Sequence, residues 1–274
     1  MLQNSYDIPD GIRKTLARLD AEEAPESRGY LESLAARDGF AEDDPYVIAH
    51  ILLECDRPGP LPVPVRELVE ELFMAACLGG NPDAMNDLGA QYYDGSRGFE
   101  QDFTKAVNCY KIAAQYGSRQ AQENLGYCYY YGRNMPVDYE KAFHYFALGA
   151  FDGHLISLYK IADMYWNGYY VERNPVEAFH IYEHCIDVMS EEAAERVAGP
   201  VYLRLGNAFL NGIGTEENAK RALVCFQKAE SFLFDMAANG ETMYRKSLEA
   251  AVAGQAKARE KLMDQLPEDE WEFD

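Results

Sequence analysis

The chain has 274 residues, and its 46 Asp and Glu side chains outnumber its 25 Lys and Arg, which gives a formal net charge of −21. Direct binding to nucleic acid or to an anionic membrane surface needs a basic patch, so this charge argues against both and favours a partner of basic character. No run approaches the ~18 apolar residues of a membrane span, and residues 1–7 lack the basic and apolar stretches of a secretory signal, so we expect a soluble cytoplasmic protein.

The first 80 residues are expected to be helical but to differ from the rest of the chain. Residues 1–44 predict an N-terminal helical cap with two short helices, near 9–19 and 27–37, because a stack of helices needs a polar cover at its end. Residues 45–80 predict a degenerate first helix pair. Its helices are separated by a proline-rich connector, Pro58–Pro64, which we expect to be non-helical because proline removes backbone donors.

Residues 81–240 carry a repeated pattern. Four times, a leucine or isoleucine is followed by a small residue, by an aromatic residue three positions later, and by a glycine three positions beyond that. The copies are Leu88-Gly89…Tyr92…Gly95, Leu125-Gly126…Tyr129…Gly132, Ile161-Ala162…Tyr165…Gly168 and Leu205-Gly206…Phe209…Gly212. Their first residues lie 37, 36 and 44 positions apart. A period of this length predicts a solenoid, in which each repeat buries its apolar face against its neighbours.

A second feature of each repeat is the start of another helix. In each repeat an Asp or Asn precedes an alanine by four positions and is expected to be the N-cap of this helix; these residues are Asp102, Asp138, Asn174 and Asn218. A pair of bulky residues follows at helical spacing and is expected to fill the space between repeats. The pairs are Cys109-Tyr110, Tyr145-Phe146, Ile181-Tyr182 and Cys225-Phe226.

Small residues and a glycine close the unit. In Ala113-Ala114…Gly117…Ala121, the glycine is typical of a helix C-cap, and the pattern recurs as Ala250-Ala251…Gly254…Ala258. We therefore expect residues 241–265 to form a C-terminal repeat or capping helices. The third repeat carries about eight extra residues around 190–199. Residues 230–249 predict one long helix ending near Asn239. Residues 266–274 predict an acidic disordered tail.

Together these residues resemble the Sel1-like repeat family, which is related to the tetratricopeptide arrays. The resemblance covers residues 65–262. It implies an all-α fold, an α-solenoid forming a right-handed superhelix of antiparallel helix pairs. It also implies a protein of the adaptor type, since Sel1-like proteins serve in signalling, protein quality control and host interaction.

In such stacks the first helix of each pair lines the concave side. Positions −2, +2, +5 and +6 from the pattern leucine then share one face, because each residue turns the helix by about 100°. The predicted partner-binding residues on this face are Asn86, Tyr93, Asp94, Glu123, Tyr127, Tyr130, Tyr131, Tyr159, Asp163, Trp166, Asn167 and Asn207. Tyrosine, tryptophan and carboxylates suit a ligand rich in Lys and Arg. The alternative is that several of these tyrosines pack between repeats.

No motif predicts chemistry. His180 and His184 lie one turn apart on an expected helix, with Glu177 one turn earlier, but the HExxH pattern is missing and no metal site is expected. The sequence has no Gly-x-Ser-x-Gly elbow and no phosphate-binding P-loop, so we expect no enzyme and no cofactor. Cys109 and Cys128 are expected to be buried thiols rather than a disulfide.

Two functions follow from these features. The first is a non-catalytic adaptor that binds a peptide or helix of a protein partner on an acidic, tyrosine-rich concave face. The alternative is an acidic inhibitor or decoy that blocks a basic protein, such as one that binds nucleic acid, through its negative surface. Salt distinguishes them, because a decoy loses most of its binding as ionic strength rises.

Overall fold

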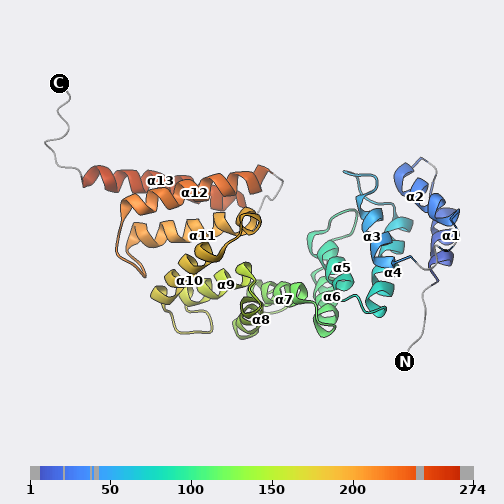
Figure 1. Ribbon diagram of the computed structural model, residues 1–274, viewed down its shortest axis with the longest axis horizontal. Helices are drawn as coiled ribbons and strands as arrows, with labels where there is room; N and C mark the ends of the chain where they lie inside the picture. The colour runs from blue at the N-terminus through green and yellow to red at the C-terminus, as the bar shows by residue number, and fades with distance from the viewer. Residues whose placement is uncertain (1–6, 21, 38, 40–42, 239–243, 266–274) are drawn as a thin grey trace, which may run out of the picture. The chain divides into compact units, whose positions relative to one another are not determined.

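The computed structural model describes residues 7–20, 22–37, 39, 43–238 and 244–265, and this part of the chain holds thirteen helices and no strand (Figure 1). The helices are α1 (Ile8–Arg18), α2 (Pro25–Ala35), α3 (Pro45–Glu54), α4 (Val63–Leu78), α5 (Asp83–Asp94), α6 (Phe103–Gln115), α7 (Arg119–Tyr131), α8 (Tyr139–Phe151), α9 (Leu155–Asn167), α10 (Pro175–Val188), α11 (Glu191–Asn211), α12 (Ala219–Ala238) and α13 (Arg245–Asp264). The all-α fold is confirmed. The chain divides into two compact units, residues 1–145 and 146–274, and α8 crosses the division.

Unit 1 begins with the two short helices that the sequence predicts, each within two residues of its expected bounds. The start of α2 has no side-chain cap of its own. The carboxylate of Asp56, in the connection between α3 and α4, takes this role instead: it accepts hydrogen bonds from the backbone N–H groups of Glu26 and Ser27, both at 3.0 Å, and from the Ser27 hydroxyl at 2.6 Å. Because these donors have no partner within the helix, the contact fixes α2 to the first helix pair.

The first pair, α3 and α4, is present, and its connector ends earlier than the prolines suggest. Helix α4 begins at Val63 with Pro64 in its first turn. Proline is tolerated there because the first-turn N–H groups have no partner within a helix in any case. The expectation of a non-helical stretch up to Pro64 is therefore wrong at its last two residues.

The four copies of the pattern build the same joint. Helices α5, α7, α9 and α11 each end at the pattern glycine in the left-handed conformation, with φ of 66°, 65°, 73° and 61° for Gly95, Gly132, Gly168 and Gly212. The predicted N-caps then accept hydrogen bonds from first-turn N–H groups, as at Asp102, Asp138, Asn174 and Asn218. Each cap residue also donates its own N–H to the carbonyl of the pattern aromatic, at 2.8–3.0 Å, in the pairs Asp102–Tyr92, Asp138–Tyr129, Asn174–Tyr165 and Asn218–Phe209. The two helices of a pair are thus joined by one recurring turn.

The small residue of the pattern makes room for an aromatic ring of the next helix. A Cβ at Gly89 would lie 2.6 Å from the ring of Tyr110, and one at Gly206 would lie 2.7 Å from the ring of Phe226. Both rings belong to the bulky pairs found in the sequence, and both are buried. The glycine directly after the pattern leucine, Gly89 or Gly206, therefore allows two helices to pack closely.

Adding a methyl group at this contact should be costly. We expect Gly89→Ala to lower the free energy of unfolding by about 1–3 kcal/mol, because the ring of Tyr110 must move in a packed core. Gly29→Ala is the matched control: this position lies in α2 of the same unit and has no atom within 4 Å of an added Cβ. Urea denaturation followed by circular dichroism measures both. Equal stability of the two variants would contradict the packing role of Gly89.

In unit 2 the extra residues lengthen a helix rather than a loop. Ser190 caps α11, and its hydroxyl accepts from the N–H of Ala193 at 3.2 Å, so the residues around 190–199 add turns to the start of this helix. The long helix expected after residue 230 is also present, since α12 runs to Ala238. Residues 239–243 and the expected tail at 266–274 lie outside the described residues.

The downstream copy of the small-residue pattern has a different role from the one expected. The interpretation of Gly254 as a helix end is wrong, because α13 continues through it to Asp264. A Cβ at Gly254 would lie 2.6 Å from the ring of Phe226. This ring is fully buried and lies between Gly206 of α11 and Gly254 of α13. Close packing on an aromatic ring, rather than chain reversal, explains the glycine.

Candidate functional site

Three of the predicted binding residues of unit 1, Tyr127, Tyr130 and Tyr131, form a cluster of tyrosines at the end of α7. The rings of Tyr127 and Tyr131 are nearly parallel, with centroids 6.1 Å apart. Tyr130 lies edge-on to Tyr131 at 4.9 Å and to Tyr139 of α8 at 5.6 Å. Tyr131 is 48% exposed, and Tyr127 and Tyr130 are half-buried. The cluster offers ring faces and edges of the kind that is enriched at protein interfaces.

An arginine of the chain itself lies on this cluster. The guanidinium carbon of Arg133 is 5.6 Å from the ring centre of Tyr131 and 5.8 Å from that of Tyr93. Arg133 also donates to the hydroxyl of Tyr93 at 3.2 Å and lies 5.0 Å from the ring centre of Phe103. These are cation–π distances. An incoming cation would therefore compete with Arg133 for Tyr93 and Tyr131. Asp94, next to Tyr93, is exposed.

Two other predicted residues of unit 1 are buried and are not available to a partner. Asn86 accepts a hydrogen bond from Asn124 of α7 at 2.9 Å. Glu123 is 3% exposed and accepts from Gln120 at 3.2 Å. The expectation that both side chains face a ligand is wrong, because the Asn86 amide is used in the contact between α5 and α7 and Glu123 is buried.

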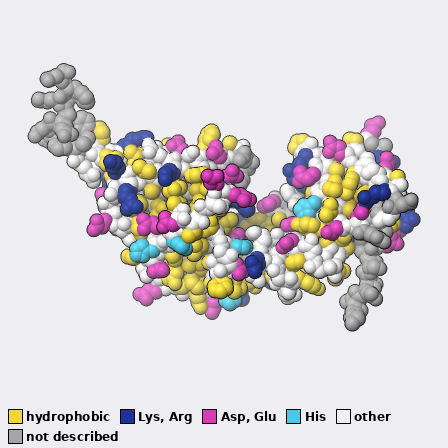
Figure 2. Space-filling view, in the orientation of Figure 1, with side chains coloured by type: hydrophobic (Ala, Val, Ile, Leu, Met, Phe, Trp, Pro, Cys, Tyr) yellow, Lys and Arg dark blue, Asp and Glu magenta, His cyan; other side chains and the backbone are white. Residues whose placement is uncertain are grey.

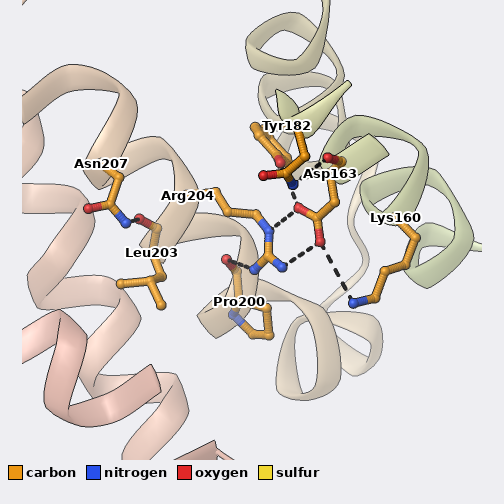
Figure 3. A network of polar contacts seen from close by, with 8 residues as sticks. Lys160, Asp163, Tyr182, Pro200, Leu203, Arg204 and Asn207 are labelled. Atoms are coloured by element: carbon orange, nitrogen blue, oxygen red, sulfur yellow. Dashed lines mark hydrogen bonds and ion pairs between the residues drawn. The ribbon is translucent and has the colours of Figure 1, made fainter. Parts of the chain in front are cut away.

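In unit 2, Tyr159 and Asp163 of α9 are likewise buried, and Asp163 is the centre of a polar network (Figure 3). Its carboxylate accepts two hydrogen bonds from the guanidinium of Arg204 in α11, one of them at 2.6 Å from Nη2, and one from the hydroxyl of Tyr182 in α10 at 2.6 Å. The ammonium of Lys160 lies 3.7 Å away. The interpretation of Asp163 as a ligand-facing acid is wrong: it joins three helices.

The charges in this network stabilise one another. Burial alone would raise the pKa of Asp163, but the adjacent Arg204 guanidinium outweighs it and holds this pKa below its usual range. Burial and the neighbouring carboxylate together raise the pKa of Tyr182 well above its ordinary value. The network is therefore a carboxylate paired with two cations, held by a neutral tyrosine, and Tyr159 lies beneath the guanidinium with 5.1 Å between the ring centre and the guanidinium carbon.

The remaining predicted residues of unit 2, Trp166, Asn167 and Asn207, keep exposed surface, and the two asparagines bond to their own helices. Trp166 is half-buried, with its ring centre 6.4 Å from that of Tyr182. The amides of Asn167 and Asn207 are exposed and donate to the carbonyls of Asp163 and Leu203, at 2.7 and 2.9 Å. Trp166, Asn167 and Asn207 thus keep the exposure that a binding role requires, and their role stays a prediction.

The described residues hold no cluster of side chains that could bind a metal ion. His180 and His184 are both exposed on α10, and no group of three or more possible metal ligands occurs in the described part of the chain. All six cysteines are free thiols. Burial raises the pKa of both Cys109 and Cys128 to about 12, which keeps them protonated and unreactive. Among the described helices, none is both long and apolar enough to cross a membrane.

Unit 2 also has a groove that the sequence analysis missed. It encloses ≈ 530 Å³ between α10 and α12, and Leu205 and Phe209 of α11 are among the residues that line it. Figure 2 shows exposed hydrophobic side chains on the visible face of this unit, with basic and acidic side chains beside them. The signal in the sequence is three basic residues, Lys220, Arg221 and Lys228, close together in a chain of net charge −21. At helical spacing these three share one side of α12.

The recurring joints, the ring-on-glycine contacts and the stacked helices define an α-helical repeat protein built of antiparallel helix pairs. The family model for the Sel1 repeat matches residues 82–118, 119–154, 155–183 and 200–231, and the chain belongs to the Sel1-like repeat family. The gap between the third and fourth matches contains the extra residues that lengthen α11. Sel1 repeats are protein-interaction modules, and the family is generally one of non-catalytic scaffolds.

Relatives match only part of the chain. It is 33% identical to protein sel-1 homolog 2 of Mus musculus over 130 residues, which is 47% of this chain and 19% of the relative. It is 36% identical over 80 residues to the ERAD-associated E3 ubiquitin-protein ligase component HRD3A of Arabidopsis thaliana, 29% of this chain and 12% of that protein. The chain therefore spans about a fifth or less of the length of these curated relatives.

Solved structures match nearly the whole fold. A Sel1 repeat protein from Oxalobacter formigenes superimposes with a TM-score of 0.61 at 18% identity, covering 93% of this chain and 97% of that one. A protective antigen of uropathogenic Escherichia coli displaying an SLR fold gives a TM-score of 0.56 at 20% identity, covering 92% of this chain and 56% of that one. At these identities the likeness shows the fold.

Proposed function

We propose that the chain is a non-catalytic adaptor that holds a peptide or helix of a protein partner on the tyrosine surface of unit 1, formed by Tyr93, Asp94, Tyr127, Tyr130 and Tyr131. The observation that supports this most strongly is the contiguous ring cluster of α7, with Tyr131 half in solvent. Aromatic residues give a large contact area at small cost in side-chain entropy, and they are enriched among the residues that dominate binding energy.

The partner proposed here has basic character, but charge acts on it mainly at long range. Glu123 and Asp163, which the sequence placed on the binding face, are buried, so Asp94 is the one exposed acid among the predicted residues. The net charge of −21 still attracts a basic segment and speeds encounter. Arg133 already lies over Tyr93 and Tyr131, so a basic side chain of the ligand would compete with it for these two rings, and the ligand proposed here also brings apolar or aromatic side chains to the cluster.

Substitution of the cluster tests this proposal. We expect Tyr130→Ala combined with Tyr131→Ala to weaken binding of an identified partner peptide by about 2 kcal/mol or more, roughly 30-fold in Kd, because two hot-spot rings are removed. The matched control is Tyr116→Ala, a tyrosine of the same unit that is 54% exposed and lies after α6. Partners are first identified by mass spectrometry of proteins that co-purify from the native host, and Kd is then measured by calorimetry. Equal Kd for the double variant and the wild type would refute the tyrosine surface.

The same titrations at low and high salt separate the adaptor from an acidic decoy. Docking on rings should weaken modestly between about 50 mM and 500 mM salt, because apolar contacts are not screened. Binding through the negative surface alone should largely disappear over that range and should be insensitive to the tyrosine substitutions. Strong salt dependence together with an unaffected double variant would favour the decoy.

A further inference from the structure

The groove of unit 2 has one basic wall and one acidic wall. Lys220, Arg221 and Lys228 line it from α12, and Glu183 and Asp187 line it from α10. Arg221 is placed over the ring of Phe209, with 4.1 Å to its centre, and reaches Glu183 at 3.4 Å. Lys228 lies 4.8 Å from the ring centre of Tyr202 and donates to its hydroxyl at 3.3 Å. The basic wall thus borders aromatic rings, which suits a ligand that carries both carboxylates and apolar rings.

Lys220 is the least engaged of these cations. It is exposed at the start of α12 and makes no ion pair with any other residue in the part of the chain that is described. Arg221 and Lys228, by contrast, already have partners within the groove. The groove therefore has a surplus of positive charge on the α12 wall, in a chain that is otherwise strongly acidic.

A segment of matching chemistry follows α13. Residues 266–274 read Leu-Pro-Glu-Asp-Glu-Trp-Glu-Phe-Asp, with five carboxylates, two aromatic rings and no basic residue. In an extended conformation, alternate side chains point to opposite faces. Trp271 and Phe273 then share one face, while Glu270, Glu272 and Asp274 share the other.

The end of α13 places this segment within reach of the groove. Near that end, Lys261 donates to the carbonyl of Leu210 at 2.8 Å and pairs with Glu217 at 2.7 Å. Leu210 follows Phe209 of the groove, and Glu217 precedes Lys220 by three residues. An extended chain spans about 3.3–3.6 Å per residue, so the seven residues from Asp264 to Trp271 cover up to roughly 25 Å. The basic wall from Lys220 to Lys228 is only about 12 Å long at 1.5 Å per helical residue.

We propose that residues 266–274 bind back into the groove between α10 and α12. The rings of Trp271 and Phe273 lie on Tyr202 and Val224, which line the groove and keep exposed surface, and the carboxylates lie against Lys220 and its neighbours on α12. The groove is then a site that the chain occupies itself, and an acidic, aromatic segment of another protein gains access only by displacing residues 266–274. This surface uses none of the tyrosines of unit 1, so it stands or falls separately from the adaptor proposal.

Tryptophan fluorescence of the full chain tests the proposal. The chain has two tryptophans, Trp166 and Trp271, so Trp166→Phe leaves Trp271 as the single reporter. We expect its emission to be blue-shifted, and its quenching by acrylamide several-fold weaker, relative to a synthetic peptide of residues 264–274. Lys220→Glu with Lys228→Glu in the same background should return both values to those of the peptide. Emission equal to that of the peptide before the charge reversal, or a blue shift that survives it, would overturn the proposal.

Chemical labelling gives a second readout in which the groove is left intact. Acetylation of lysines by a limiting reagent, followed by mass spectrometry, should label Lys220 several-fold faster in Trp271→Ser/Phe273→Ser than in the wild-type chain. Lys246 and Lys257, exposed on α13 and outside the groove, serve as internal controls with unchanged rates. Equal labelling of Lys220 in the two proteins would show that the segment does not cover this wall.

Discussion

Replacement of Arg204 by methionine should destabilise unit 2 by about 3–5 kcal/mol, because it leaves the carboxylate of Asp163 buried without its two hydrogen bonds from the guanidinium. Lys160, at 3.7 Å, is too distant to replace them. Urea denaturation measures the loss, and hydrogen exchange of α9–α11 locates it. Arg221→Met is the matched control, since this arginine also pairs with an acid but its side chain is 58% exposed; we expect less than about 1 kcal/mol. A similar loss in both variants would contradict the role given to the buried pair.

The effect of Arg204→Met should depend on pH in a defined direction. Because the pKa of Asp163 is lower in the folded chain than the unfolded value of about 3.9, the stability from this carboxylate is present above that value and is lost as pH falls through the folded pKa. Without Arg204, burial raises the pKa of Asp163, and the carboxyl is protonated more readily. The difference in free energy of unfolding between wild type and variant should therefore shrink as pH falls toward 4 and below. A difference that is constant from pH 7 to 4 would exclude the charge pair as its cause.

The second large effect is expected at Phe226. Phe226→Ala should destabilise unit 2 by about 3–5 kcal/mol, because the ring is fully buried between glycines of α11 and α13 and leaves a cavity that those backbones cannot fill without moving. Phe234→Ala, on the same helix but 60% exposed, should change the free energy of unfolding by less than about 1 kcal/mol. Urea denaturation of the two variants measures this difference. Equal midpoints would mean that Phe226 does not hold α11 and α13 together.

The joints of the repeat could be predicted because their causes are local. A left-handed glycine such as Gly95 and a cap such as Asp102 act within a few residues of their own positions, and a regular spacing reveals them. The third repeat shows the same. Ala162 occupies the position that Gly89 and Gly206 have in other copies, and the left-handed Gly168 and the cap Asn174 still form the joint. Secondary structure from α5 to α12 follows from such signals.

Burial of Tyr159 agrees with the alternative that some of the tyrosines pack between repeats. Burial of the polar residues could not be foreseen, because their partners are distant in sequence. Asp163 meets Arg204, 41 residues later, through the lengthened α11, and nothing in the pattern places that guanidinium. Asn86 meets Asn124, 38 residues away. Helical spacing identified one face of each first helix, but not which neighbour lies on it. The division of the chain within α8 likewise has no counterpart in the sequence pattern.

The hydrogen bond from each cap residue to the aromatic carbonyl has a practical result for redesign. It fixes the span from the left-handed glycine to the cap at seven residues in the first copy and six in the other three. The stretch between Val188 and Val197, by contrast, has already absorbed additional turns without disturbing the joints on either side. An epitope tag or a grafted loop should therefore be inserted between successive helix pairs, near Ser190, where the fold already contains extra residues. An insertion inside a pair would break the hydrogen bond between the cap residue and the aromatic carbonyl.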